Sequence, residues 1–261
     1  MANHSLIYFC LTTYEPRVEW KLLPGRVGYI KINDLISTNI VPQFDAALEG
    51  LRASRGLVLD LRDIPRGGNT DVAEPIMGRL IERRTGYQQV VPLHAPAYIK
   101  EVAPRGDWAY KAPVVVLVNR WTASMGEGMA IGLDGMKRAT VVGTRMAGLN
   151  GGIFDLQLPR TKIGVAYAGE RLNHIDGTPR EDFVPPVLVN LMNRRLSRYH
   201  DPIFEVGYKE LLKLIRRRPN SPSPLPTYQS HGARALNSPR PITRVIRPSR
   251  ASGPSSALTP Q

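Results

Sequence analysis

Two short segments combine residue types suited to acyl transfer, and each follows a strongly apolar run. In residues 119–127 (NRWTASMGE), Ser124 comes after the run PVVVLV. Gly67 and Gly68 lie in residues 60–70 (DLRDIPRGGNT), shortly after a similar apolar run, GLVLDL. A serine hydroxyl can serve as a nucleophile, and the backbone N–H groups of a glycine turn can hold a negative oxygen. Both segments are therefore candidate sites for acyl-transfer chemistry.

Each segment also has an ordinary structural interpretation. Ser124 stands where a strand gives way to a helix, and serine is a common N-terminal cap. Glu127 follows three residues later, which is the spacing of a capping box. A Gly-Gly pair is most often only a turn. The spacing alone therefore favours a cap over a nucleophile for Ser124 and leaves the role of the glycine turn open.

The elements that must position these residues alternate between strands and helices. Short apolar runs predict strands, whereas apolar residues at helical spacing predict helices, with Asp71 as the cap of the second one. We expect strands at 27–32, 56–61, 113–118, 140–142, 153–158 and 163–167, and helices at 42–53, 71–84, 124–134 and 202–216. This alternation indicates an α/β layered domain. Residues 85–112 are less regular, and we expect a loop or lid there.

Charge and composition separate the end of the chain from its body. The formal net charge is +13, but residues 216–261 hold eight of the 35 Lys and Arg residues and none of the 22 Asp and Glu residues. The same stretch is rich in Pro and Ser, so we expect it to be a disordered tail. Because the excess positive charge lies there, it gives no reason to expect nucleic-acid binding by the body. We divide the chain into a lead-in (1–19), a catalytic core (20–216) and a tail (217–261).

Other function classes find little support. No apolar run reaches the roughly 20 residues of a membrane span, and the apolar residues 6–11 (LIYFCL) lack the flanks of a signal peptide. The single cysteine, Cys10, allows no internal disulfide and no metal cluster, and we interpret it as a buried apolar side chain. We expect no cofactor and no metal. The compartment and the oligomeric state are not indicated.

Five motifs in a fixed order resemble the catalytic core of the tail-specific (C-terminal processing) proteases and the tricorn core protease. They are GYIKI, GLVLDLRDIPRGGN, APVVVLVNRWTASMGEGMAIGL, ATVVGTRMAGLNGGI and HIDGTPREDFVPPVLV. The resemblance covers roughly residues 20–192. It implies a crotonase-like (Clp protease-like) α/β fold of repeated strand-strand-helix units, and serine-type peptide hydrolysis of a polypeptide substrate.

The resemblance also implies roles for individual residues. Ser124 matches the nucleophile and Glu127 the acidic residue that follows it in the motif. The N–H of Met125 would be one oxyanion donor, with a second from Gly67 or Gly68. Glu181, in the closing motif, matches an assisting carboxylate, although a surface charge paired with Arg180 is an equally good interpretation.

The sequence departs from the resemblance at the general base. Members with a Ser–Lys dyad carry a lysine in a Gly-Lys-Gly stretch, where this chain has Leu149 between Gly148 and Asn150. A tricorn-like histidine base is therefore expected, and its place is upstream of the core. His4, His94 and His174 are weak candidates, because lone histidines are more often structural or exposed. We therefore expect the base to lie upstream of this chain.

Three functions compete on this evidence. The leading one is a serine peptidase acting through Ser124. The second is a catalytically inactive or incomplete relative that binds peptide ends or an apolar ligand, which the missing lysine favours. The third is a basic nucleic-acid binder, for which only the tail argues, so deleting residues 217–261 should remove any such binding.

Overall fold

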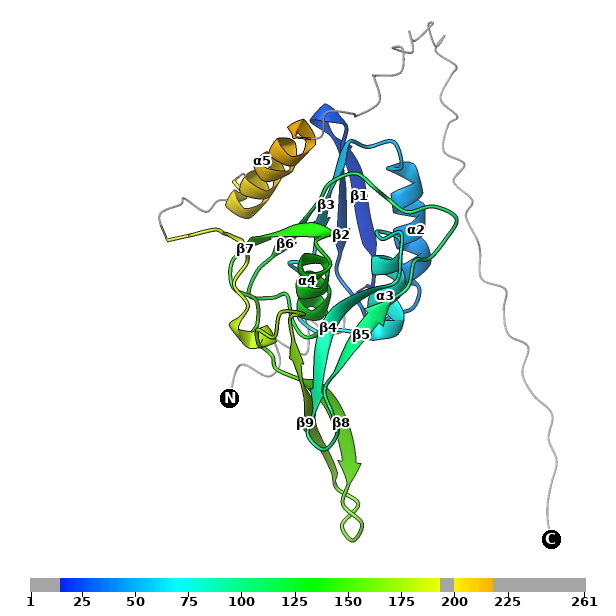
Figure 1. Cartoon of the computed structure of the whole chain (residues 1–261), viewed down its shortest axis with the longest axis vertical. Helices are drawn as coiled ribbons and strands as arrows, with labels where there is room; N and C mark the ends of the chain where they lie inside the picture. The colour runs from blue at the N-terminus through cyan, green and yellow to red at the C-terminus, as the bar shows by residue number, and fades with distance from the viewer. Residues whose placement is uncertain (1–14, 193–199, 218–261) are drawn as a thin grey trace, which may run out of the picture. The chain divides into compact units, whose positions relative to one another are not determined.

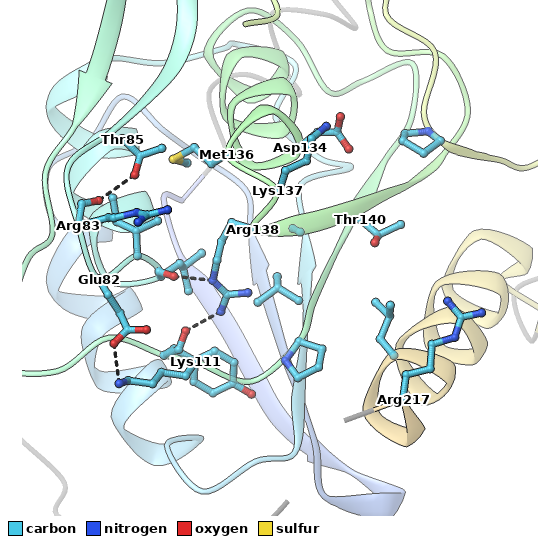
Figure 2. A pocket seen from close by; sticks show the side chains of 18 residues that line it. Glu82, Arg83, Thr85, Lys111, Asp134, Met136, Lys137, Arg138, Thr140 and Arg217 are labelled. Atoms are coloured by element: carbon cyan, nitrogen blue, oxygen red, sulfur yellow. Dashed lines mark hydrogen bonds and ion pairs between the residues drawn. The ribbon is translucent and has the colours of Figure 1, made fainter. Parts of the chain in front are cut away.

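Residues 15–192 and 200–217 are the part of the chain that the computed structural model describes, and all of them belong to one unit. The predictions for His4 and Cys10, and that for the tail beyond residue 217, lie outside these ranges. Within them, strands and helices alternate along the chain, and the sheets are of both parallel and antiparallel type (Figure 1). The predicted α/β class is therefore confirmed, while its crotonase-like arrangement stays a prediction.

The larger sheet has six strands in the order β1-β2-β3-β6-β7-β10. Their bounds are β1 Val18–Leu23, β2 Val27–Ile32, β3 Gly56–Asp60, β6 Val114–Val118, β7 Ala139–Gly143 and β10 Val187–Leu188. Only β1 runs antiparallel to its neighbour, so β2, β3, β6, β7 and β10 all point the same way. The loops that follow these parallel strands consequently emerge at one edge of the sheet.

Helices cover both faces of this sheet. Along β3, Leu57 and Leu59 belong to a core shared with α2 (Ile40–Gly50), α3 (Thr70–Gly78) and α4 (Met125–Gly135). Val58, between them, belongs to a second core under α5 (Pro202–Arg216). Both faces of the strand are buried, which explains why its sequence is apolar throughout rather than alternating.

Arg62 ties the larger sheet to α5. Its guanidinium lies 2.6 Å from Oδ2 of Asp60, a fully buried carboxylate at the end of β3, and 2.7 Å from Oδ1 of Asp201. Asp201 also caps α5, because its side chain accepts the N–H of Phe204 at 3.0 Å. One arginine therefore joins the end of β3 to a helix that is distant in sequence.

The smaller sheet has four antiparallel strands in the order β5-β4-β9-β8. Their bounds are β4 Thr85–Pro92, β5 Tyr98–Val102, β8 Gly152–Gln157 and β9 Gly164–Asn173. The fully buried Tyr87 on β4 packs against α4 where Gly132 leaves room for its ring. Beyond this contact, β8 and β9 extend away from the other elements (Figure 1).

The structure corrects three expectations. Residues 85–112 contain β4 and β5 rather than a loop or lid, because the buried Tyr87 and Val90 on β4 give that segment a core face. Asp71 is not a cap: it lies in the first turn of α3, whose N-cap is Asn69. That helix ends at Gly78, well short of residue 84. In the described ranges, no helix has the length and apolar character of a membrane span.

Candidate active site

Four loops meet at the edge where the parallel strands end, and backbone hydrogen bonds join them in sequence order. The loop after β2 is bridged to the glycine turn, which is bridged to the segment before α4, which in turn binds the loop after β7. The bonds are Asn69 N to Leu35 O (2.7 Å), Ala123 N to Ile64 O (3.2 Å) and Ala147 N to Thr122 O (3.1 Å). Ligands of open α/β sheets bind at this edge.

Thr122 fixes the segment that leads into Ser124. Its buried hydroxyl donates to the carbonyl of Leu61 at 2.9 Å and accepts the N–H of Asn119 at 3.0 Å. The end of β6 is thereby held to the end of β3. Sequence reasoning missed this residue, because a threonine before a helix has no distinctive spacing.

Ser124 adopts a backbone conformation that ordinary helix caps do not. An N-cap residue normally lies in the β region, whereas Ser124 has φ 50° and ψ −112° at the start of α4. Residues other than glycine adopt this backbone conformation at a cost of about 1–3 kcal/mol. Ser124 and Glu127 form the capping box that their spacing predicts. The cap interpretation alone, however, gives no reason for the strained backbone.

The predicted glycine turn lies directly against Ser124. A methyl group added to Gly67, which has φ 67°, would stand 2.5 Å from the Ser124 Cβ. A methyl group on Gly68 would meet Leu35 at 2.2 Å. Both positions therefore exclude any side chain, and the structure brings together the two segments that the sequence singled out separately.

The expected oxyanion donors differ in their hydrogen bonding. The Gly67 N–H already donates to the carbonyl of Ile64 at 3.3 Å. For the N–H groups of Gly68 and Met125, the described residues provide no acceptor. The Met125 N–H is also at the first turn of α4, where the helix dipole favours negative charge. Of the three expected donors, Gly68 and Met125 are therefore those whose N–H groups no described residue binds.

Glu127 is a buried carboxylate that holds three backbone N–H groups. It accepts the N–H of Ser124 at 2.7 Å, that of Gly148 at 2.9 Å and that of Leu149 at 3.3 Å. Burial raises its pKa above the ordinary value, against the opposing effects of the nearby Arg180 charge and the three N–H donors. Glu127 therefore links the backbone of Ser124 to the loop after β7.

Arg180 holds the same loop through its carbonyl groups. This buried side chain donates to Leu149 O at 2.6 Å and to Gly151 O at 3.2 Å. Burial lowers the pKa of the guanidinium, and the charge of Glu127 opposes this effect. Residues 148–151 are thus bound from both sides, with N–H groups on a carboxylate and C=O groups on a guanidinium. Sequence reasoning treated Arg180 only as a possible partner of Glu181.

Glu181 lies beside this clamped loop, in the 3-10 turn Arg180–Asp182. Its Oε1 accepts a hydrogen bond from the Asn150 side chain at 3.4 Å. Leu149, which occupies the position of the expected lysine, has an exposed fraction of 47%. The structure therefore brings Glu181 to the loop that adjoins Ser124, but it offers a leucine where a proton acceptor was expected.

The three described histidines show no contact with the site, and one of them, His200, pairs with Glu205 of α5 at 2.8 Å. His174 is buried at the far end of α4, where its Nε2 lies 3.4 Å from Asp134 and its Nδ1 lies 2.8 Å from Asp176. An 11-residue helix is about 15 Å long, so His174 cannot reach Ser124. His94 is exposed in the connection between β4 and β5. The described ranges also contain no group of three His, Cys, Asp or Glu side chains that could bind a metal.

Comparison with known proteins identifies the family. The model described as peptidase family S41 matches residues 26–185, which is more than half of the chain. The chain therefore belongs to peptidase family S41, and the resemblance to tail-specific proteases inferred from the five motifs is confirmed. Among curated proteins, no match was found.

Solved structures share the fold at low sequence identity. A protein from Parabacteroides merdae ATCC 43184 has a TM-score of 0.66 and 20% identity, over 81% of this chain and 70% of that one. The photosystem II D1 C-terminal processing protease has a TM-score of 0.59 and 23% identity, over 75% and 53%. Mature CPAF has a TM-score of 0.59 and 15% identity, over 74% and 52%. The chain thus spans about half the length of the latter two proteins.

Proposed function

We propose that this chain is a serine-type peptidase, a hydrolase of peptide bonds that acts through Ser124. The observation that carries the proposal is the strained backbone of Ser124 against Gly67, within a family of peptidases. Strain of this kind persists only where surrounding structure enforces it, and it clusters at active sites. We also propose that the layers follow the crotonase-like plan of strand-strand-helix units.

The reaction would proceed by acyl transfer. The Ser124 hydroxyl oxygen attacks the carbonyl carbon of the substrate and gives its proton to a general base. The N–H groups of Met125 and Gly68 stabilise the negative oxygen of the tetrahedral intermediate. When the tetrahedral intermediate collapses, the C–N bond breaks and the general base gives the serine proton to the leaving amine. Water then attacks the ester and releases the carboxylic acid and the free Ser124 hydroxyl.

We propose a tricorn-like base, a histidine, rather than a Ser–Lys dyad. Leu149 supports this choice, since its side chain has no group that accepts a proton. His174 is excluded by its place at the opposite end of α4. His94 is exposed between β4 and β5, and His200 pairs with Glu205 on α5. The proposed base is therefore a histidine outside the described residues, with Glu181 as the carboxylate that orients it. The polypeptide substrate is proposed from the family alone.

A fluorophosphonate probe tests the nucleophile. Because such probes phosphonylate activated serines, we expect labelling of the wild-type chain and loss of labelling in Ser124→Ala. Ser37→Ala, at the end of the loop after β2, is the matched control and should keep its label. Labelling that survives in Ser124→Ala would refute the assignment of Ser124.

The alternative function is an inactive relative that binds peptides. The observation that favours it is the exposed Leu149 in place of the lysine. If the wild-type chain takes no label but binds a peptide with equal affinity in wild type and Ser124→Ala, the binding module is the correct interpretation.

A further inference from the structure

Within the described part of the chain, residues 153–168, the outer part of the β8–β9 hairpin, pair with no strand except each other. The pairing of β9 with β4 is confined to residues 170–173 of β9. Every residue from 153 to 168 is exposed. We call these residues the arm; Figure 1 shows it projecting beyond β4 and β5. An isolated two-stranded ribbon is marginally stable in water, so an arm of this kind gains stability from a partner.

The arm has one apolar face. The register pairs Phe154 with Tyr167 and Leu156 with Val165, and a further bond from Leu158 N to Ile163 O continues the same face toward the tip. All six side chains are large and apolar, and their exposed fractions lie between 37% and 58%. The opposite face carries Asp155, Gln157, Ala166 and Ala168, together with Ile153. Contiguous apolar patches of this extent mark interaction sites.

Charges at the two ends of the apolar face have opposite sign. The tip carries Arg160 and Lys162 in the turn between the strands. At the base, the Glu170 carboxylate lies over Gly152, because a methyl group on Gly152 would meet its Oε1 at 2.6 Å. Gly152 and Glu170 are paired across the two strands. Gly152 lies on the side of Phe154, because its neighbour Gly151 faces Ala168 on the opposite side. The face therefore runs from a basic tip through an apolar centre to an acidic base.

We propose that the arm binds the arm of a second copy of this chain. The two apolar faces would pack together in antiparallel orientation about a two-fold axis, with each basic tip over the partner's acidic base. A two-fold interface repeats every contact, so the opposite charges at the ends are satisfied twice by one arrangement. A parallel arrangement would instead place the two tips together and repel. The proposal is independent of the catalytic role of Ser124.

Two adjacent residues of β9 provide a matched test. Val165 lies on the apolar face and Ala166 on the opposite face, so Val165→Glu and Ala166→Glu add the same charge to different sides of one strand. By sedimentation equilibrium of the full-length chain, we expect a dimer for wild type and Ala166→Glu. For Val165→Glu we expect a dissociation constant raised at least about tenfold. Circular dichroism checks that both variants fold alike.

Crosslinking tests the orientation. In a Cys10→Ser background, Val165→Cys stands near the centre of the face and should form a disulfide between two copies. Lys162→Cys should not link to itself, but it should link to Glu170→Cys when the two chains are mixed. Three results would each overturn the proposal. They are a monomeric wild-type chain, equal weakening of the dimer by Val165→Glu and Ala166→Glu, and a disulfide between two copies of Lys162→Cys.

Discussion

At the scale of single residues, Ser124 combines a strained backbone with a position at the start of a helix. Its φ of 50° is one that glycine adopts freely. We therefore expect Ser124→Gly to unfold with a free energy about 1 kcal/mol higher than that of Ser124→Ala, although alanine is the better helix former. Urea denaturation of the two variants measures the difference. Equal stability, or a more stable alanine variant, would show that the backbone is not strained.

Glu127 gives a second prediction, on pH. Burial raises its pKa in the folded state, so folding favours the protonated form. The stability that this shift contributes is complete below the unfolded-state pKa and is lost as the pH rises through the folded-state value. The unfolding free energy of wild type should therefore fall relative to that of Glu127→Gln, a neutral analogue, as the pH rises from about 4 to about 7.

The matched control for this measurement is Glu19→Gln. Glu19, on β1, is an exposed carboxylate paired with Arg17. Exposed ion pairs contribute little to stability, so Glu19→Gln should change the unfolding free energy little. If the unfolding free energy of wild type instead rises with pH relative to that of Glu127→Gln, folding favours the ionised form of Glu127 and the prediction is wrong.

At the scale of elements, the loop 148–151 owes its conformation to side chains from two other elements. Arg180 contacts two carbonyl groups at once with a planar guanidinium, which a lysine cannot reproduce. We expect Arg180→Lys to increase hydrogen exchange at residues 148–151 and to lower the unfolding free energy by about 1–3 kcal/mol. Arg171→Lys, an exposed arginine on β9, should change neither quantity, and equal effects of the two would contradict the clamp.

The elements themselves could be predicted from the sequence where one pattern dominates. β2 and α5 have the predicted bounds, and β3, β6 and α4 differ from them by one residue. The strand β4 could not be predicted, because its buried Tyr87 and Gln88 both carry polar groups and a bulge interrupts its register. For the candidate site, local sequence gave Ser124 and the glycine turn. The contact between them, and the clamp by Arg180, depend on pairings far apart in sequence.

At the scale of the whole molecule, the described unit contains its own core. The two apolar clusters are built from residues between Val27 and Ile215, and the unit defined by contacts ends at Ser221. We expect a chain that stops at Ser221 to keep its unfolding free energy within about 0.5 kcal/mol of the full-length value. Urea denaturation tests this expectation, and a loss of several kcal/mol would show that the remaining residues contribute to the fold.

The bonds between the four loops have a consequence for how the chain folds. The site draws on Leu35, Gly68, Thr122, Gly148 and Arg180, which are separated by more than half of the sequence. Parallel strand pairing of this kind forms slowly, because long stretches of chain must close before their contacts form. During synthesis, the loop after β7 lacks its hydrogen bonds from Arg180 until that residue has joined the structure. If Ser124 is the nucleophile that we propose, a partly made chain lacks an assembled site and leaves neighbouring polypeptides intact.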